Sequence, residues 1–171
     1  MHTTISIRPA TLADIPAIRD VAARTWRATY DGLIAAPDID LFLDRAYSEA
    51  NVAWTLDRLG DGYLVATADE TVVGYAMAGP DRDGAAQLWA IYVLPEYQGQ
   101  GIGHALWQRA AAHLRAAGFG EFSLWVVAGN LPARRFYERY GAEPVAERVD
   151  QLGASSVPEV RYRVALDQTA G

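Results

Sequence analysis

Hydrophobic and polar positions follow two different periods along this chain. Short apolar or alternating runs of strand length lie at residues 5–8, 62–68, 72–78, 88–94, 121–127, 145–149 and 157–166. Apolar residues at helical spacing lie at residues 12–30, 37–58, 104–117 and 130–140, and the second of these ranges has room for two helices. Neither a repeat nor a linker interrupts the series. The pattern therefore predicts one mixed α/β domain over residues 1–171.

The centre of this pattern is the segment 88–114, where a strand is followed by a glycine-rich loop and a helix. Pro95 and the glycines at 99, 101 and 103 end the strand, and helical spacing resumes after them. Such an order directs several backbone N–H groups and the positive end of a helix dipole at one point beyond the strand. That point suits a phosphate group. The alternative is a glycine-rich turn that only connects strand and helix.

Two common phosphate-binding motifs do not fit this loop. A Walker loop ends in Gly-Lys-Ser/Thr, and the loop contains no lysine. The dinucleotide fingerprint G-x-G-x-x-G fails because Gly99 and Gly101 are followed by His104 at the third glycine position. An acidic residue, Glu121, lies about twenty residues further on, but it begins the next strand instead of ending it, which is the wrong place to hold a ribose. The spacing thus disfavours nucleoside triphosphates and dinucleotides.

Composition narrows the class of protein. Hydrophobic residues make up 51% and charged residues 21% of the chain, which is typical of a globular protein. The net charge of −6 and the lack of a basic tract argue against a nucleic-acid partner, and weakly favour a cationic substrate such as an amine. No apolar run approaches the roughly 18 residues of a membrane span, and residues 1–9 lack the apolar centre of a signal peptide. We therefore expect a cytoplasmic protein with no membrane partner.

Cysteine and histidine content restricts the chemistry. The chain has no cysteine, which excludes a disulfide, a thiolate metal site and an enzyme-bound thioester. His104 and His113 lie nine residues apart, on opposite faces of their helix, so with His2 they make a poor metal set and no metal is expected. If the protein transfers an acyl group from a thioester, the acceptor must attack that thioester directly unless another side chain intervenes.

The glycine-rich loop matches a known family. It reads Gln98-Gly99-Gln100-Gly101-Ile102-Gly103. This resembles the acetyl-CoA loop of GNAT-superfamily N-acetyltransferases, whose pattern Gln/Arg-x-x-Gly-x-Gly/Ala is filled here by Gln98, Gly101 and Gly103.

The helix at residues 130–140 carries a second motif of the same family. The family segment Asn-x-x-Ala-x-x-x-Tyr-x-x-x-Gly-Phe is matched by Asn130, Ala133, Tyr137 and Gly141, and Ala142 replaces the usual Phe. Taken alone, this segment could be any capped amphipathic helix. The two motifs in this order make the resemblance specific over residues 88–142, and the order of elements extends it to residues 5–166.

The resemblance implies both a fold and a cofactor. The fold is a central mixed, mostly antiparallel twisted sheet of about seven strands, flanked by helices and splayed between its fourth and fifth strands. Acetyl-CoA would bind in that gap, with its pantetheine arm along the backbone of the strand and its pyrophosphate on N–H groups of the loop. The implied cofactor-binding residues are Ile91, Tyr92, Val93, Gln98, Gly99, Gln100, Gly101, Ile102, Gly103, Asn130 and Ala133.

The resemblance also implies a catalytic residue. An amine that attacks the thioester forms an oxyanion, which a backbone N–H near Val93 would stabilise. Tyr137 matches the general acid of the family, and a phenol with a pKa of about 10 is protonated at neutral pH. The alternative for Tyr137 is an aromatic residue of the core. No general base is evident, because residues 88–92 contain no carboxylate; Tyr92, Glu96 and Asp31 are remote candidates that would act through water.

The acceptor amine is expected on the side opposite the cofactor. Trp26 and Tyr30 lie four residues apart on one helical face beside Asp31, and such a pair can hold a cationic amine by cation–π contact. This segment resembles that of polyamine acetyltransferase-like members, and Trp89 is a third candidate for substrate binding. The alternative is that Trp26 and Tyr30 pack in the core.

These observations predict an acetyl-CoA-dependent N-acetyltransferase that acts on a small amine. Acetylation of protein N-termini or lysines, modification of an antibiotic, and a CoA-binding sensor or assembly module without catalysis remain alternatives. The resemblance also suggests a homodimer, to which Tyr162 and Val164 of the last strand could contribute. The identity of the amine does not follow from the sequence.

Overall fold

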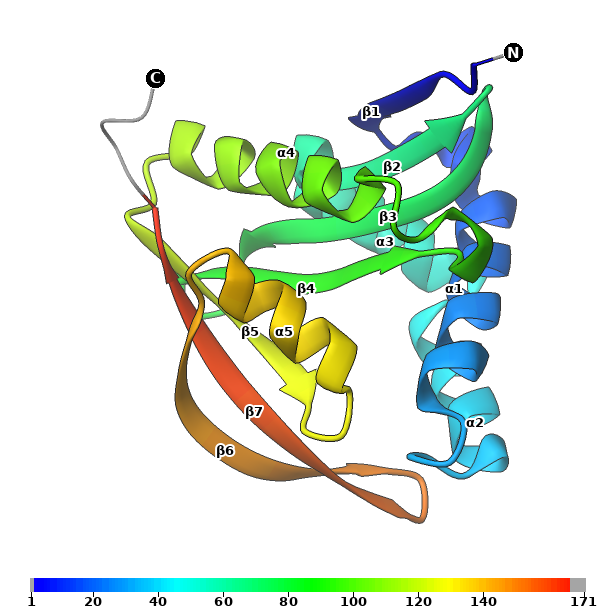
Figure 1. Cartoon of the computed structure of the whole chain (residues 1–171). Helices are drawn as coiled ribbons and strands as arrows, with labels where there is room; N and C mark the ends of the chain where they lie inside the picture. Colours follow the sequence, from blue (N-terminus) through cyan, green and yellow to red (C-terminus); the bar gives the residue numbers. More distant parts are fainter. Residues whose placement is uncertain (1, 167–171) are drawn as a thin grey trace.

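A seven-stranded sheet runs through the molecule in the computed structural model, which describes residues 2–166 (Figure 1). Its strand order is β1-β2-β3-β4-β5-β7-β6, and every neighbouring pair is antiparallel except β4 and β5. The predicted mixed, mostly antiparallel sheet is thus confirmed. The strands are β1 (Ile5–Pro9), β2 (Tyr63–Ala68), β3 (Thr71–Pro80), β4 (Ala86–Val93), β5 (Glu121–Val127), β6 (Glu143–Leu152) and β7 (Ser155–Ala165).

Helices cover both faces of this sheet. α4 (Ile102–Ala116) and α5 (Leu131–Arg139) lie on the face toward the viewer in Figure 1. The opposite face is covered by α1 (Ile15–Tyr30), α2 (Ala36–Ala46) and α3 (Glu49–Leu59). Short 3₁₀ turns precede α1, β2 and the glycine-rich loop. Within residues 2–166, no helix is both long and apolar enough to cross a membrane.

The range 37–58 forms two helices, and this break changes which residues are buried. α2 ends at Ala46, and Ser48 caps α3 by accepting a hydrogen bond from the Asn51 N–H. Because the helical phase restarts there, Trp54 is 59% exposed although the sequence pattern placed it on an apolar face. The N-cap of α2 is Ala35, and Asp38 lies in the first turn of the helix.

The predicted contribution of Tyr162 and Val164 to a dimer interface does not fit their positions. Both side chains are buried in the core. The Tyr162 hydroxyl accepts a hydrogen bond from Arg134 Nε at 3.0 Å and donates one to Glu138 at 2.8 Å. Tyr162 therefore holds α5 onto β7 and, like the buried Val164, does not face a second protomer.

The sheet opens between β4 and β5. These strands pair at one register position only, Gln87 with Ser123, and diverge beyond it. On its other side β4 has an irregularity: Ala90 pairs with Met77 and Leu88 with Ala78, so Trp89 is an additional residue opposite the same stretch of β3. The fourth and fifth strands are therefore splayed as expected, and the free edges of both face a gap.

Candidate active site

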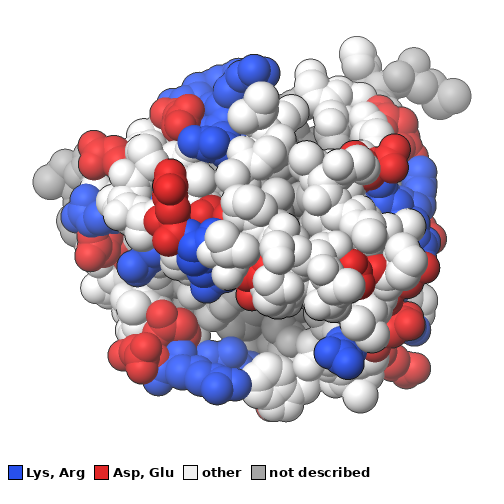
Figure 2. Space-filling view, turned by 90° about the horizontal axis from the view of Figure 1, so that it is seen from below, with Lys and Arg blue, Asp and Glu red and all other residues white. Residues whose placement is uncertain are grey.

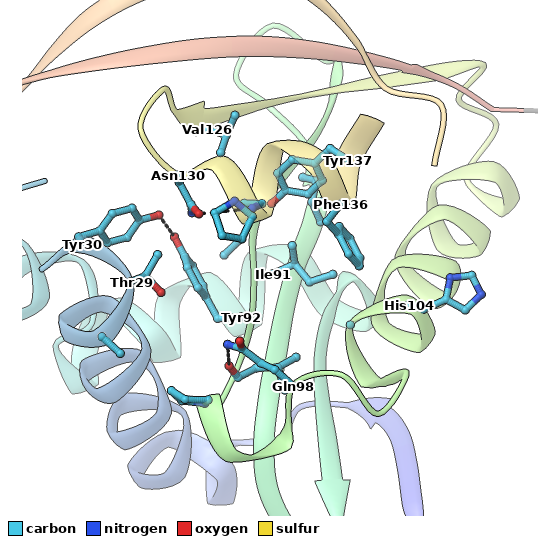
Figure 3. Close-up of a pocket in the computed structure, with 18 of the residues that line it drawn as sticks. Thr29, Tyr30, Ile91, Tyr92, Gln98, His104, Val126, Asn130, Phe136 and Tyr137 are labelled. Atoms are coloured by element: carbon cyan, nitrogen blue, oxygen red, sulfur yellow. Dashed lines mark hydrogen bonds between the residues drawn. The ribbon is translucent and has the colours of Figure 1, made fainter. Parts of the chain in front are cut away.

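A cavity of about 710 Å³ lies at the gap between β4 and β5 (Figure 3). Its walls come from the end of α1, from β4, from the loop before α4, from the end of β5 and from α5. Most of the sequence-predicted residues are brought together here. Those that line the cavity are Tyr30, Trp89, Ile91, Tyr92, Val93, Gln98, Gly99, Gly101, Gly103, Asn130, Ala133 and Tyr137.

The edge of β4 offers unpaired backbone groups to the cavity. The Leu94 N–H donates to the Val73 carbonyl of β3 at 2.9 Å. Because successive residues of a strand direct their N–H and C=O groups to opposite sides, Tyr92 also faces β3, whereas Ile91 and Val93 face the gap. A ligand with amide groups can therefore bind at this edge as an additional strand.

The glycine-rich loop is held against this edge. Gln98 Nε2 donates to the Val93 carbonyl at 2.9 Å, which fixes the start of the loop at the end of β4. Gly99 and Gly101 have φ values of 76° and 83°, a region that L side chains seldom adopt. Gly101 is the N-cap of α4, so the free N–H groups of the first helical turn begin at the cavity. The loop thus has the geometry of an anion site.

Tyr137 reaches the cavity from α5. Asn130 caps this helix, since its Oδ1 accepts a hydrogen bond from the Ala133 N–H at 3.3 Å. About two turns further on, the Tyr137 ring is buried against Trp107 and Phe136, and its hydroxyl has no hydrogen-bond partner within residues 2–166. Burial raises the pKa of Tyr137 well above the usual range of a phenol. The group is therefore a protonated donor at neutral pH.

A pair of tyrosines forms the wall opposite Tyr137. The Tyr30 and Tyr92 hydroxyl oxygens lie 2.7 Å apart and share a hydrogen bond between α1 and β4 (Figure 3). Burial raises the pKa of both phenols, so both stay protonated at neutral pH. One hydroxyl donates within the pair, which leaves the other with a proton to donate and both with lone pairs toward the cavity.

Three predicted site residues do not line the cavity. Trp26 is buried and stacked on Phe42 with ring centroids 4.1 Å apart, so it supports Tyr30 from behind and is a core residue. Ile102 is buried within the core because it lies on the sheet side of α4. The Gln100 amide donates to the Glu96 carbonyl at 3.4 Å, away from the cavity.

None of the three residues suggested as remote general bases is placed to take a proton in the cavity. Glu96 is exposed and paired with Arg24 at 2.5 Å. A hydrogen bond from its own backbone N–H, and then the contact with Arg24, lower the pKa of its carboxyl group. Asp31 follows α1 on the exposed surface and does not line the cavity. Tyr92 lines it but stays protonated. No carboxylate side chain is among the lining residues that the structure describes.

Several lining residues had not been singled out from the sequence. On the side of α1 and β5 these are Thr29, Leu33 and Trp125, and on the side of α4 and α5 they are His104 and Phe136. His104 follows Gly103 directly and stacks on Tyr140 at 4.8 Å, so its position beside the loop was a usable signal. Trp125 lies in the middle of a predicted strand, where alternation does not reveal which face borders a cavity.

The split sheet, the loop at the start of α4 and the tyrosine on α5 define an acyltransferase of the GNAT fold. The chain belongs to the acetyltransferase (GNAT) family, whose model matches residues 17–142, and it is an acetyltransferase. It is 34% identical over 162 residues to an uncharacterized N-acetyltransferase, YuaI, of Bacillus subtilis, covering 91% of this chain and 90% of that protein. It is 27% identical over 163 residues to the spermidine N(1)-acetyltransferase of Thermoplasma acidophilum, covering 93% and 98% of the two chains.

Solved structures support the fold. The PaiA N-acetyltransferase of Thermoplasma acidophilum, solved in complex with coenzyme A, superimposes with a TM-score of 0.79 at 24% identity, covering 95% of this chain and 99% of that chain. The protein yncA of Salmonella typhimurium, solved with its cofactor acetyl-CoA, gives a TM-score of 0.73 at 23% identity, covering 98% of this chain and 96% of that chain.

Proposed function

We propose that the protein transfers an acetyl group from acetyl-CoA directly to the primary amine of a small molecule, within a ternary complex. The observation that carries this proposal is the convergence of three features on one cavity. These are the free backbone edge of β4, the N–H groups at the start of α4 and the unpartnered hydroxyl of Tyr137. The spermidine acetyltransferase relative supports an amine of low molecular weight as the acceptor.

The cofactor fits residues that lie in order along the cavity. The amide groups of the pantetheine arm would pair with the backbone of Ile91 and Val93, and the pyrophosphate would accept hydrogen bonds from the loop 98–103. Gly101 leaves open space there, since a Cβ built on it meets no atom within 4 Å. When bound, acetyl-CoA supplies an activated thioester and a thiolate leaving group.

The chain's own groups would assist each stage of the transfer. Direct attack by the amine fits a sequence without cysteine, which cannot form an enzyme-bound thioester. The Val93 N–H, which faces the gap, is available to an oxyanion formed at the thioester carbon. As the carbon–sulfur bond breaks, Tyr137 gives its proton to the thiolate. Burial raises the pKa of Tyr137, so the phenolate that remains takes a proton back from water before the next turnover.

The amine proton has to leave without a carboxylate in the cavity. The Tyr30–Tyr92 pair can accept a hydrogen bond from the ammonium group or from a water that carries its proton outward. The pair would thereby position the amine for attack, while bulk water serves as the final proton acceptor.

The direct test is the variant Tyr137→Phe, assayed for thiol release with acetyl-CoA and a panel of amines. We expect turnover to fall about 100-fold, the typical contribution of one positioned acid, while the acetyl-CoA dissociation constant stays unchanged. Tyr140→Phe is the matched control, since Tyr140 lines the same cavity but stacks on His104. Unchanged turnover in Tyr137→Phe would remove this residue from the mechanism.

A further inference from the structure

The acceptor side of the cavity is poor in negative charge although the whole chain carries a net charge of −6. Its walls there are Thr29, Tyr30, Leu33, Trp89 and Trp125, none of which is acidic. The pKa of Tyr30 is raised partly by the charge of Glu159, but that carboxylate is paired with Arg148 Nε at 2.8 Å. A polycation entering this side would therefore meet no free carboxylate among the lining residues.

Each tryptophan of this wall already has an arginine guanidinium over its ring. The Arg148 guanidinium carbon lies 4.0 Å from the Trp125 ring centroid, and the Arg58 guanidinium carbon lies 5.6 Å from the Trp89 centroid. These distances are within the range of cation–π contact. One face of each ring is thus engaged by a cation of the chain itself, which disfavours a second cation on the same ring.

A further cation stands beside Trp125 without an acidic partner. Arg161 is paired with Trp125 across β5 and β7, so the two side chains leave the sheet on the same face. Its guanidinium donates to Ser123 Oγ at 3.3 Å, at the closed end of the gap where Gln87 and Ser123 pair. Within residues 2–166, no carboxylate lies at ion-pair distance from it. Figure 2 shows the lower face of the molecule, where basic and acidic side chains both lie around a hollow.

We infer that the acceptor is an amine that carries an anionic group at its far end, attached through an apolar or aromatic body. The body would lie between Trp89 and Trp125, and the anionic group would bind the free N–H groups of Arg161. This inference rests on the proposed function and narrows its substrate class. It disfavours the polyamines acetylated by the Thermoplasma relative.

Three aromatic amines that differ only in their far end provide the test. They are 4-(aminomethyl)benzoate, benzylamine and 1,4-bis(aminomethyl)benzene, which end in an anion, a hydrogen and a cation. Each is titrated calorimetrically into the CoA-saturated protein, so that binding is measured without turnover. We expect the benzoate to bind about ten-fold more tightly than benzylamine, and the diamine more weakly than either, with differences that shrink as salt is added.

Two variants test whether Arg161 causes the preference for the benzoate. Arg161→Gln should reduce the preference for the benzoate about five-fold, as expected for the loss of one charge-assisted contact at a solvent-accessible site. Arg163→Gln is the control, because Arg163 lies on the same face of β7 but pairs with Glu121 farther from the gap. An equal loss of the preference for the benzoate in both variants would contradict a specific role for Arg161.

The outcomes separate this inference from the proposed function. Equal or tighter binding of the diamine, or no binding of the benzoate at millimolar concentration, overturns the anionic acceptor. If the benzoate binds with the expected preference but no amine releases thiol from acetyl-CoA, the acceptor site stands and the transferase proposal fails.

Discussion

At the scale of single residues, a substitution at Gly101 can distinguish the cost of backbone strain from the loss of a ligand contact. Gly101 and Gly84 share a φ of +83°, and a Cβ on either meets no atom within 4 Å. Only Gly101 lines the cavity. We expect Gly101→Ala and Gly84→Ala to lose about 1 kcal/mol of unfolding free energy each, because an L residue is strained there.

Acetyl-CoA binding should differ between these two variants. Gly101→Ala places a methyl group beside the N–H groups that would hold the pyrophosphate, so its acetyl-CoA KM should rise about ten-fold. Gly84→Ala should keep the KM of the unmodified protein. Denaturant melts and steady-state kinetics measure the two effects, and equal KM values would show that the loop does not contact the cofactor.

At the scale of elements, one carboxylate joins α2 to the turn between β6 and β7. Asp38 accepts hydrogen bonds from the Ala154 N–H at 3.1 Å and from Ser155 Oγ at 2.5 Å, and these bonds lower the pKa of its carboxyl group. The Ala35 N–H donates to Ser155 Oγ at 3.3 Å. The contact thus ties the segment after α1, which includes the cavity-lining Leu33, to the far hairpin of the sheet.

Asp38→Asn should lower the melting temperature at neutral pH. A lowered carboxyl pKa gives stability that is present above the usual Asp pKa of about 3.9 and is lost as pH falls through the folded-state value. The difference from the unmodified protein should therefore shrink in acid. Asp40→Asn is the control on the same helix, since Asp40 makes only an exposed pair with Arg27. Thermal melts over a pH series test this, and a difference that grows in acid would contradict it.

At the scale of the molecule, sequence periodicity predicted where the helices and strands lie. It predicted less well what surrounds the side chains on them. Residues 121–127 are a strand as predicted, and the helix at 130–140 begins after its Asn130 cap. The positions of the aromatic side chains were harder to predict, because periodicity shows that residues share a face but not what packs against that face. Trp26 faces Phe42 in the core, whereas Trp125 was missed because its place on the cavity depends on the pairing of β5 with distant β7.

The division of the sheet suggests how a ligand would affect the whole molecule. One half of the sheet is formed by β1 to β4 and the other by β5 to β7. The two halves are joined where β4 pairs with β5, at the single register position of Gln87 and Ser123. A pantetheine arm bound along β4 would bridge these halves. Acetyl-CoA at about 100 times its dissociation constant should add about 2.7 kcal/mol to the unfolding free energy.

Hydrogen exchange can show where this stabilisation arises. The N–H groups of Ile91 and Val93 face the gap, whereas that of Tyr92 already faces β3, so the free protein should protect Tyr92 and leave its two neighbours exchanging quickly. Acetyl-CoA should slow exchange at Ile91 and Val93 by hydrogen bonding to that edge. Gly101→Ala, measured at the same ligand concentration, should show weaker protection. Protection that rises equally at all three residues would indicate general stabilisation without pairing of the ligand to β4.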